Sequence, residues 1–166
     1  MTGIYTTSSY RTEDSLGFLL GRCMNRIVDE IDVALAEYDV TAEQFGVLHA
    51  IYRGKATSPS ELARLRYRHT AAITYTLDVL EKRKLLARKR SREDRRVITL
   101  QLTPAGTEVT RACIPRVVEA QNQVLRRVDR KEYELLSGLL RRIANPTLLA
   151  HETSGARRPT VAMAKG

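Results

Sequence analysis

The sequence predicts a mainly helical fold of the α+β class, and three observations support this prediction. Apolar residues recur at three- and four-residue steps in several segments between residues 15 and 144, which is typical of amphipathic helices. Between residues 86 and 102 the period changes to two, which is typical of short strands. The chain has 166 residues, 43% of them hydrophobic, which is enough to form one buried core.

The N-terminal part of the chain is expected to form a flexible arm and then a long helix. Residues 1–12 are polar and show no period, so we expect the arm there. The helix is expected over about residues 14–38. Its inward stripe is predicted to consist of Leu16, Leu20, Cys23, Ile27, Ile31, Leu35 and Tyr38.

Two helix-start signals follow, Thr41–Gln44 and Ser58–Glu61. In each, a hydroxyl residue stands three positions before Gln or Glu, which is typical of a capping box, and Pro59 suits a first helical position. The first short helix is expected to face inward through Phe45, Leu48, His49 and Tyr52. The second is expected to face inward through Leu62, Ala63 and Leu65.

A break at residues 66–69 separates the second short helix from a third helix, expected over residues 70–83. Its two faces are predicted to differ in burial. The inward residues are Ile73, Leu77 and Leu80, and the residues of the opposite face are Ala71, Thr74, Tyr75 and Asp78.

The remaining elements are a hairpin and two helices. Residues 86–89 and 97–102 are the expected strands, and residues 90–95 form a charged tip between them. A long helix is expected from Thr103–Pro104 to about Arg127, with a kink at Pro115. Its inward side would be Val109, Cys113, Val117, Ala120 and Val124. The last helix, residues 133–144, would begin after a cap at Asp129, and its stripe would be Leu136, Leu139, Leu140 and Ile143.

This order of elements predicts one winged helix-turn-helix over about residues 41–102, flanked by long helices over about 14–38 and 104–144. The whole forms a single unit over residues 13–146, followed by a flexible tail over 147–166. The flanking helices carry more apolar surface than one small domain needs. We therefore expect them to form a homodimer.

Positive charge is concentrated in one part of the chain. The net charge is +9, and residues 64–96 contain 12 Lys or Arg but only 4 Asp or Glu. Such a concentration favours an anionic partner, either nucleic acid or a lipid surface. Because this segment ends in a strand hairpin rather than a basic amphipathic helix, it favours nucleic acid. A solvated surface of no function is the alternative.

Other classes of protein are disfavoured by what the sequence lacks. It has no phosphate loop, zinc-protease motif or nucleophile elbow, so we expect no enzyme, no cofactor and no metal site. Two cysteines, Cys23 and Cys113, cannot form a disulfide framework and are expected to be buried. With no signal segment and no long apolar run, the chain is expected to be cytoplasmic.

A winged helix-turn-helix binds DNA through its second helix, because the major groove is wide enough for a helix. The helix over residues 70–83 is therefore expected to enter the major groove. The arginine-rich hairpin tip, residues 90–96, is expected to reach phosphates or the adjacent minor groove. The predicted DNA-binding residues are Arg66, Arg68, His69, Thr70, Ala71, Thr74, Tyr75, Arg88, Arg90, Arg92, Asp94 and Arg96.

The stretch VTAEQFGVLHAI, followed by SPSELARLRYRHTAAITYTLDVLEKRKLLARKRSREDRRVITLQLTPAG, resembles the multiple antibiotic resistance regulator (MarR) family. The resemblance implies a homodimer on a pseudo-palindromic operator, usually a repressor released by a small, often phenolic, ligand. It also implies that Asp94 orients the wing and that Arg96 enters the minor groove. Two positions depart from the family pattern: Lys84 replaces a common Gly, and Tyr75 a common basic residue.

Four residues are candidates for an effector site. Arg22 follows Phe18 at four-residue spacing, so the pair could hold a carboxylate and stack on a ring. His49 and Tyr52 lie on the helix that borders the pocket in the family. An aromatic or heteroaromatic carboxylic acid is the predicted effector class. The alternatives are a surface or intersubunit salt bridge for Arg22 and a core histidine for His49.

Two other functions stay open. One is a regulator that senses oxidants through a cysteine, as one branch of the family does. There the cysteine precedes a Phe-Leu-Leu run, where this sequence has Gly17. The other is a non-specific nucleic-acid binder that uses only the basic segment. A specific regulator should prefer its operator over random DNA by at least about 10³-fold.

Overall fold

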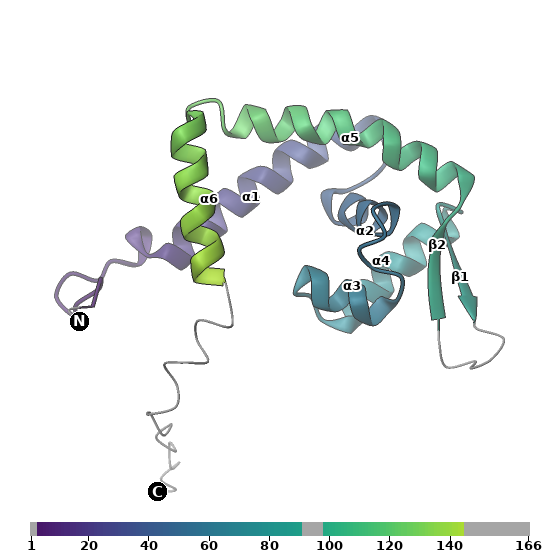
Figure 1. The fold of residues 1–166 in the computed structure, drawn as a ribbon, viewed down its shortest axis with the longest axis horizontal. Coiled ribbons are helices and arrows are strands. Elements are labelled where there is room, and N and C mark those ends of the chain that lie inside the picture. Colours follow the sequence, from purple (N-terminus) through teal and green to yellow (C-terminus); the bar gives the residue numbers. More distant parts are fainter. Residues whose placement is uncertain (1–2, 91–97, 145–166) are drawn as a thin grey trace, which may run out of the picture. The chain divides into compact units, whose positions relative to one another are not determined.

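The mainly helical fold with one two-stranded sheet is confirmed by the structure, a computed structural model that describes residues 3–90 and 98–144 (Figure 1). The chain divides into two units, Met1–Val124 and Leu125–Gly166, each described by itself. The elements of the first unit are η1 (Thr12–Asp14), α1 (Leu16–Leu35), η2 (Ala36–Tyr38), α2 (Ala42–Tyr52), α3 (Pro59–Arg66), α4 (Thr70–Lys82), β1 (Leu86–Arg90), β2 (Ile98–Leu102) and α5 (Pro104–Val124).

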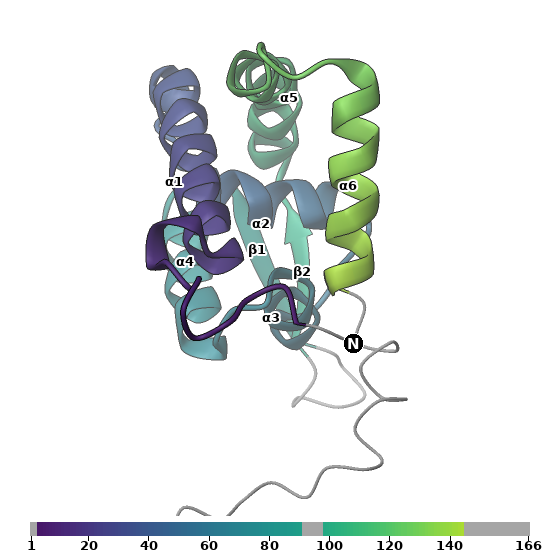
Figure 2. The same ribbon diagram turned by 90° about the vertical axis from the view of Figure 1, so that its left-hand side faces the viewer.

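Helices α1 and α5 pack side by side in the first unit, and α2 lies beneath them (Figures 1 and 2). Helix α2 also contacts α4 and β2, so neighbours surround it. Val47 and Leu48 are fully buried there, and Phe45 and Ala50 are nearly so. Of the residues predicted to face inward, Phe45 and Leu48 are buried and His49 is partly buried, whereas Tyr52, at the end of the helix, is exposed. Burial also extends to Val47 and Ala50, outside the predicted face.

The helix starts follow the capping chemistry of the sequence. At Thr41 the capping box is complete, because its hydroxyl accepts the Gln44 N–H while the Gln44 side chain accepts the Thr41 N–H. At Ser58 only half of the box forms. The Ser58 hydroxyl accepts the Glu61 N–H, but the Glu61 carboxylate accepts the N–H of Thr57 at 2.7 Å.

The predicted inward stripe of α1 is buried only near the C-terminal end of the helix. Ile31 and Leu35 belong to the core, whereas Leu16 and Leu20 are exposed. Cys23 is exposed too, which corrects the expectation that it is buried. The reason is that the core cluster of the first unit reaches α1 only from Ile27 onward. The N-terminal half of α1 thus presents apolar side chains at the surface of this unit.

Strands β1 and β2 form the expected antiparallel hairpin, in which Arg88 pairs with Leu100. The hairpin is joined to the helices by backbone bonds, since the Leu100 N–H donates to the carbonyl of Thr57 at 2.8 Å. Near the start of α5, Gly106 lies against the backbone of Leu85, the residue just before β1. A Cβ on Gly106 would overlap the Leu85 carbonyl, so glycine is needed at this position. Pro115 lies inside α5, as predicted, and Cys113 is buried.

The second unit contains α6 (Arg130–Ala144), which begins three residues before the predicted start. Its cap at Asp129 is confirmed, because the Asp129 carboxylate accepts the N–H groups of Lys131 and Glu132. None of the α6 residues is buried, and the exposed apolar ones are Tyr133, Leu135, Leu136, Leu139 and Ile143.

The first residues of the chain contain a local turn, in which the N–H groups of Ser9 and Tyr10 donate to the carbonyl of Thr6. The Tyr5 hydroxyl accepts the Leu16 N–H at 2.9 Å, which connects this segment to the start of α1. The flexibility of residues 1–12 and of the tail remains a prediction, and residues 145–166 lie outside the described part.

Candidate nucleic-acid interface

Helix α4 has one buried face and one exposed face, as the sequence predicts. Ile73, Leu77 and Leu80 are buried, and Thr76 joins them with its hydroxyl donating to the carbonyl of Ala72. The exposed face contains the predicted residues Thr70, Ala71, Thr74 and Tyr75. The helix is thus anchored from one side and presents small polar and aromatic groups on the other.

The turn before α4 consists of residues 67–69. Tyr67 ends α3 with a left-handed backbone, φ 51°, and its side chain is 89% exposed. His69 is the extended N-cap residue of α4, and its side chain makes no capping hydrogen bond. Arg68 and His69, both predicted to bind DNA, are exposed here. A sharp turn therefore sets α3 and α4 at an angle to each other (Figure 1).

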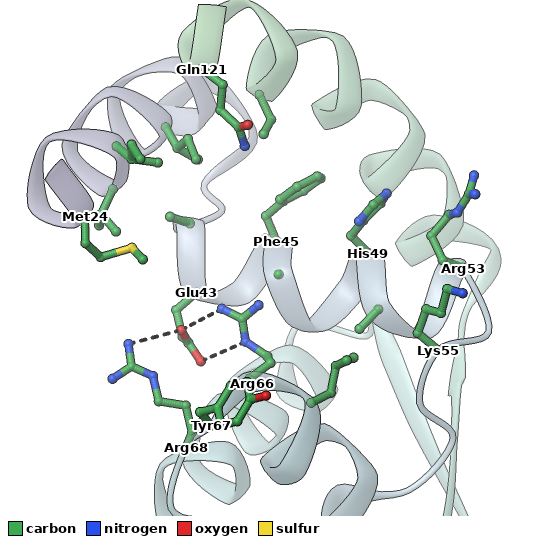
Figure 3. A pocket seen from close by; sticks show the side chains of 18 residues that line it. Met24, Glu43, Phe45, His49, Arg53, Lys55, Arg66, Tyr67, Arg68 and Gln121 are labelled. Carbon is green, nitrogen blue, oxygen red and sulfur yellow. Dashed lines mark hydrogen bonds and ion pairs between the residues drawn. The ribbon is translucent and has the colours of Figure 1, made fainter. Parts of the chain in front are cut away.

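Arg66 is held by a carboxylate of α2 rather than being free. Its Nη2 lies 2.9 Å from Glu43 Oε2, and its Nε donates to Glu43 Oε1 at 3.4 Å (Figure 3). Arg68 approaches the same carboxylate at 3.7 Å. A Cβ on Gly46 would overlap the Arg66 guanidinium, so this glycine leaves room for the side chain to lie across α2.

Arg88 is likewise engaged inside the unit. Its Nη1 lies 2.6 Å from Asp78 Oδ1 and 2.9 Å from Glu81 Oε2, both on α4. The Arg88 N–H also donates to the Glu81 carboxylate at 3.2 Å. These contacts hold β1 against the exposed side of α4.

The remaining predicted residues belong to the wing. Arg90 is the last residue of β1, where it pairs with Ile98 of β2. Arg92, Asp94 and Arg96 lie outside the described residues. The contact of each predicted residue with DNA remains a prediction.

Beside the helix-turn-helix lies a pocket of about 940 Å³, which we call the α2 pocket (Figure 3). It is bounded by α1, α2, the end of α3, the following turn and α5. Its lining residues are Met24, Ile27, Val28, Ile31, Ala42, Glu43, Phe45, Gly46, His49, Ala50, Arg53, Lys55, Leu65, Arg66, Tyr67, Arg68, Val117 and Gln121. Leu65, predicted to face inward, is exposed here because α3 covers the core mainly through Leu62.

Of the four predicted effector residues, only His49 lines the α2 pocket. Its ring stacks on Phe45 with 5.3 Å between ring centroids and 15° between planes. Burial, and then the charge of Arg53, lower the pKa of His49 below its usual value. Phe18 and Arg22 are exposed on the N-terminal half of α1, and Tyr52 lines a separate hollow of about 290 Å³.

Sequence reasoning missed Glu43, Gly46, Arg53 and Lys55 as pocket residues. Glu43 lies inside the first capping box, and it was assigned no role beyond helix initiation. Arg53 and Lys55 lie just after the end of α2 at Tyr52, and no sequence motif marks them. Glu43 and Arg66 are 23 positions apart, a separation at which no helical or strand period applies.

Fold and site together define a winged helix-turn-helix DNA-binding protein. A model described as the MarR family matches residues 38–97. Over 142 residues the chain is 30% identical to the HTH-type transcriptional regulator YdcH of Bacillus subtilis, covering 83% of this chain and 92% of that one. The chain belongs to the MarR family, and it is a DNA-binding transcription regulator.

Two solved structures show the same fold. One is a variant of MarR from Escherichia coli complexed with operator DNA, with TM-score 0.73, 24% identity and coverage of 78% of this chain and 94% of that one. The other is BpsR of Bordetella bronchiseptica, whose DNA binding is described as regulated by 6-hydroxynicotinic acid. It has TM-score 0.73, 24% identity and coverage of 82% and 97%. Within the described residues, no helix is both long and apolar enough to span a membrane.

Proposed function

We propose that the chain is a homodimeric repressor that binds a pseudo-palindromic operator and is released by a small aromatic acid. The DNA-binding part of this proposal rests on the exposed face of α4. The opposite face of this helix is buried in the core, and the helix has no carboxylate from Thr70 to Leu77. A helix presented in this way fits the major groove.

The residues of this interface differ in role. Thr70, Ala71, Thr74 and Tyr75 face the bases, with Tyr75, 73% exposed, suited to contact a thymine methyl or a phosphate. Arg68 and His69 approach phosphates at the start of α4. In the wing, the family pattern assigns Asp94 to orientation and Arg96 to the minor groove. Arg90 and Arg92, as part of the arginine-rich tip, would reach phosphates or the minor groove.

The engaged arginines act differently. Arg66 and Arg88 are each paired with carboxylates inside the unit, so we assign them to positioning. Arg66 holds the end of α3 against α2. Arg88 holds β1 against α4.

Dimerisation is supported by apolar surface in both units. The N-terminal half of α1 exposes Leu16, Phe18, Leu19, Leu20 and Met24, and α6 exposes a leucine-rich stripe. Exposed apolar surface of this kind favours association. A two-fold dimer places its half-sites about one helical turn, or roughly 10 bp, apart. Light scattering should show a dimer that Leu139→Glu dissociates, whereas Lys131→Glu, on the same helix, should leave it intact.

Effector release is supported by the α2 pocket. It is mainly apolar, with stacked rings on one wall and cationic side chains around it, which suits an aromatic carboxylic acid. BpsR, of the same fold, responds to such an acid. Among the residues predicted to bind the effector, His49 lines the α2 pocket and is kept as a contact. Phe18, Arg22 and Tyr52 do not line it, so they could contact an effector only at a different site.

The test is fluorescence anisotropy with the duplex upstream of the chain's own gene and a shuffled duplex of equal length. We expect a preference of at least about 10³-fold for the first duplex. Tyr75→Ala should reduce this preference, whereas Tyr52→Ala, which removes a ring from the end of α2, should not. Equal affinities that fall steeply with salt would show a non-specific binder and overturn the proposal.

A further inference from the structure

We propose that Arg66 and Arg68 form an anion site in the wall of the α2 pocket, that Glu43 occupies this site in the ligand-free protein, and that an aromatic carboxylate replaces Glu43 on binding. This inference rests on the proposed effector response. It adds the position of the ligand's charge and a route from the pocket to the DNA-binding helix.

The Glu43 ion pair shows that Arg66 can hold a carboxylate at two points in this wall of the pocket. Each carboxylate oxygen accepts from Arg66, one from Nε and the other from Nη2, in a two-point arrangement (Figure 3). Arg68 approaches from the other side at 3.7 Å. The Arg66 and Glu43 side chains are only 25% and 33% exposed, so the pair is partly shielded from water.

The guanidinium has a built position in the fold. Gly46, one turn after Glu43 on α2, has no side chain, and any Cβ there would overlap the Arg66 guanidinium. The Arg66 side chain therefore lies against α2 at Gly46, in the pocket wall. A planar cation in a defined place is suited to hold a planar carboxylate.

The charges around the α2 pocket do not balance. Arg53, Lys55, Arg66 and Arg68 line it, whereas Glu43 is the one carboxylate among the described lining residues. If Glu43 turns away, this wall carries uncompensated positive charge. A ligand that brings its own carboxylate restores the pairing, and its ring can pack near Phe45 and His49.

The anion site lies at the start of the DNA-binding helix. Arg66 is the last residue of α3, and Arg68 lies two residues before α4 begins at Thr70. The Glu43 pair connects α2 to this turn. When a ligand takes the place of Glu43, that connection is broken, and the turn before α4 is free to shift. Each protomer can thus respond through its own turn.

The experiment is isothermal calorimetry with benzoate and 6-hydroxynicotinate as probes and benzamide as the neutral analogue. Glu43→Gln removes the competing charge but keeps an oxygen for Arg66, so we expect benzoate to bind about 3- to 10-fold more tightly. Benzamide should not distinguish this variant from the parent. Arg66→Lys should weaken benzoate binding by about 10-fold or more, because the two-point contact is lost.

The control variant is Glu108→Gln, which makes the same charge change in the exposed Glu108–Arg111 pair of α5, away from the α2 pocket. It should bind every probe as the parent does. Circular dichroism melts of all variants show whether each is folded.

Two outcomes would overturn the inference. One is benzoate affinity in Glu43→Gln equal to or below that of the parent. The other is absence of benzoate binding in both the parent and Glu43→Gln, because removal of the Glu43 charge should leave the anion site open. Operator binding by the parent protein without probe separates the two proposals. Selective binding by the parent keeps the proposed function when the inference fails, and lack of selectivity in the parent removes the function itself.

Discussion

Tyr67 and Lys84 have the same unusual backbone conformation, and they lie at opposite ends of α4. Tyr67 has φ 51° before the helix begins, and Lys84 has φ 58° after it ends. The left-handed region is unfavourable for side chains with a Cβ. Lys84 stands where the family commonly has glycine, whereas no sequence signal marked Tyr67.

Replacing either residue by glycine should therefore stabilise the protein. We expect Lys84→Gly and Tyr67→Gly each to raise the free energy of unfolding by about 1 kcal/mol, measured by urea denaturation. Gly54 is the reverse control, because it has φ 62° with open space around it, so Gly54→Ala should lose a similar amount. A loss of stability in both glycine variants would show that the strain argument is wrong.

The ion pairs of the arginines predict different salt effects on DNA binding. Arg68→Ala should reduce the slope of log affinity against log salt by about 1, because a phosphate contact is lost. Arg88→Ala should weaken operator binding while leaving the slope nearly unchanged, since Asp78 and Glu81 already neutralise this guanidinium.

Salt titrations by anisotropy measure both slopes. Arg111→Ala is the control, because it removes an exposed arginine from α5. If Arg88→Ala lowers the slope as much as Arg68→Ala does, Arg88 is itself a phosphate contact rather than a positioning residue.

The elements of the fold could be predicted because their signals are local. The Thr41–Gln44 box, the stripe Ile73–Leu77–Leu80 and the change of period at residue 86 each lie within a few neighbouring residues. Burial around α2 could not be predicted, since it depends on four elements that meet there. The Glu43–Arg66 pair was missed for the same reason, because only the folded chain brings positions 23 apart together.

The face of α1 shows a further limit. Its period indicated correctly which residues share a face, but not how far the core extends along it. Cys23 was therefore assigned to the interior although it is exposed. In contrast, Cys113 on α5 belongs to the buried core cluster, and there the prediction of burial from the helical period is confirmed.

Stability should depend on pH through His49. Burial and Arg53 lower its pKa in the folded chain, so the unfolded chain binds more protons just below the ordinary value of 6.5. The stabilisation is present above pH 6.5 and is lost as the pH falls through the folded pKa. Urea denaturation at pH 7.5 and 5.5 should show this loss in the parent and a smaller one in His49→Phe, which can keep the stack on Phe45. His69→Gln is the control, and an equal loss in all three proteins would contradict the prediction.

Release from DNA by peroxide should not depend on Cys113. Burial, and then the charge of Glu37, raise the pKa of this thiol to about 11, so it is protonated near neutral pH. The thiolate is the reactive form. Anisotropy with the operator should show the same peroxide response in Cys113→Ala as in the parent. A response lost in this variant, but kept in Cys23→Ala, would instead support the oxidant-sensing alternative.

The same thiol predicts a loss of stability at alkaline pH. In the unfolded chain Cys113 ionises near its ordinary pKa of 9.0, whereas in the folded chain it stays protonated up to about pH 11. Between these pH values the unfolded chain binds fewer protons than the folded chain. The free energy of unfolding therefore falls as the pH rises, by at most about 1.4 kcal/mol per pH unit. Below pH 9 the stabilisation is complete. Urea denaturation from pH 8 to 10.5 should therefore give a shallower decline for Cys113→Ala than for the parent. Cys23→Ala, which removes the exposed thiol, should keep the parent's slope, and equal slopes in all three proteins would exclude Cys113 as the titrating group.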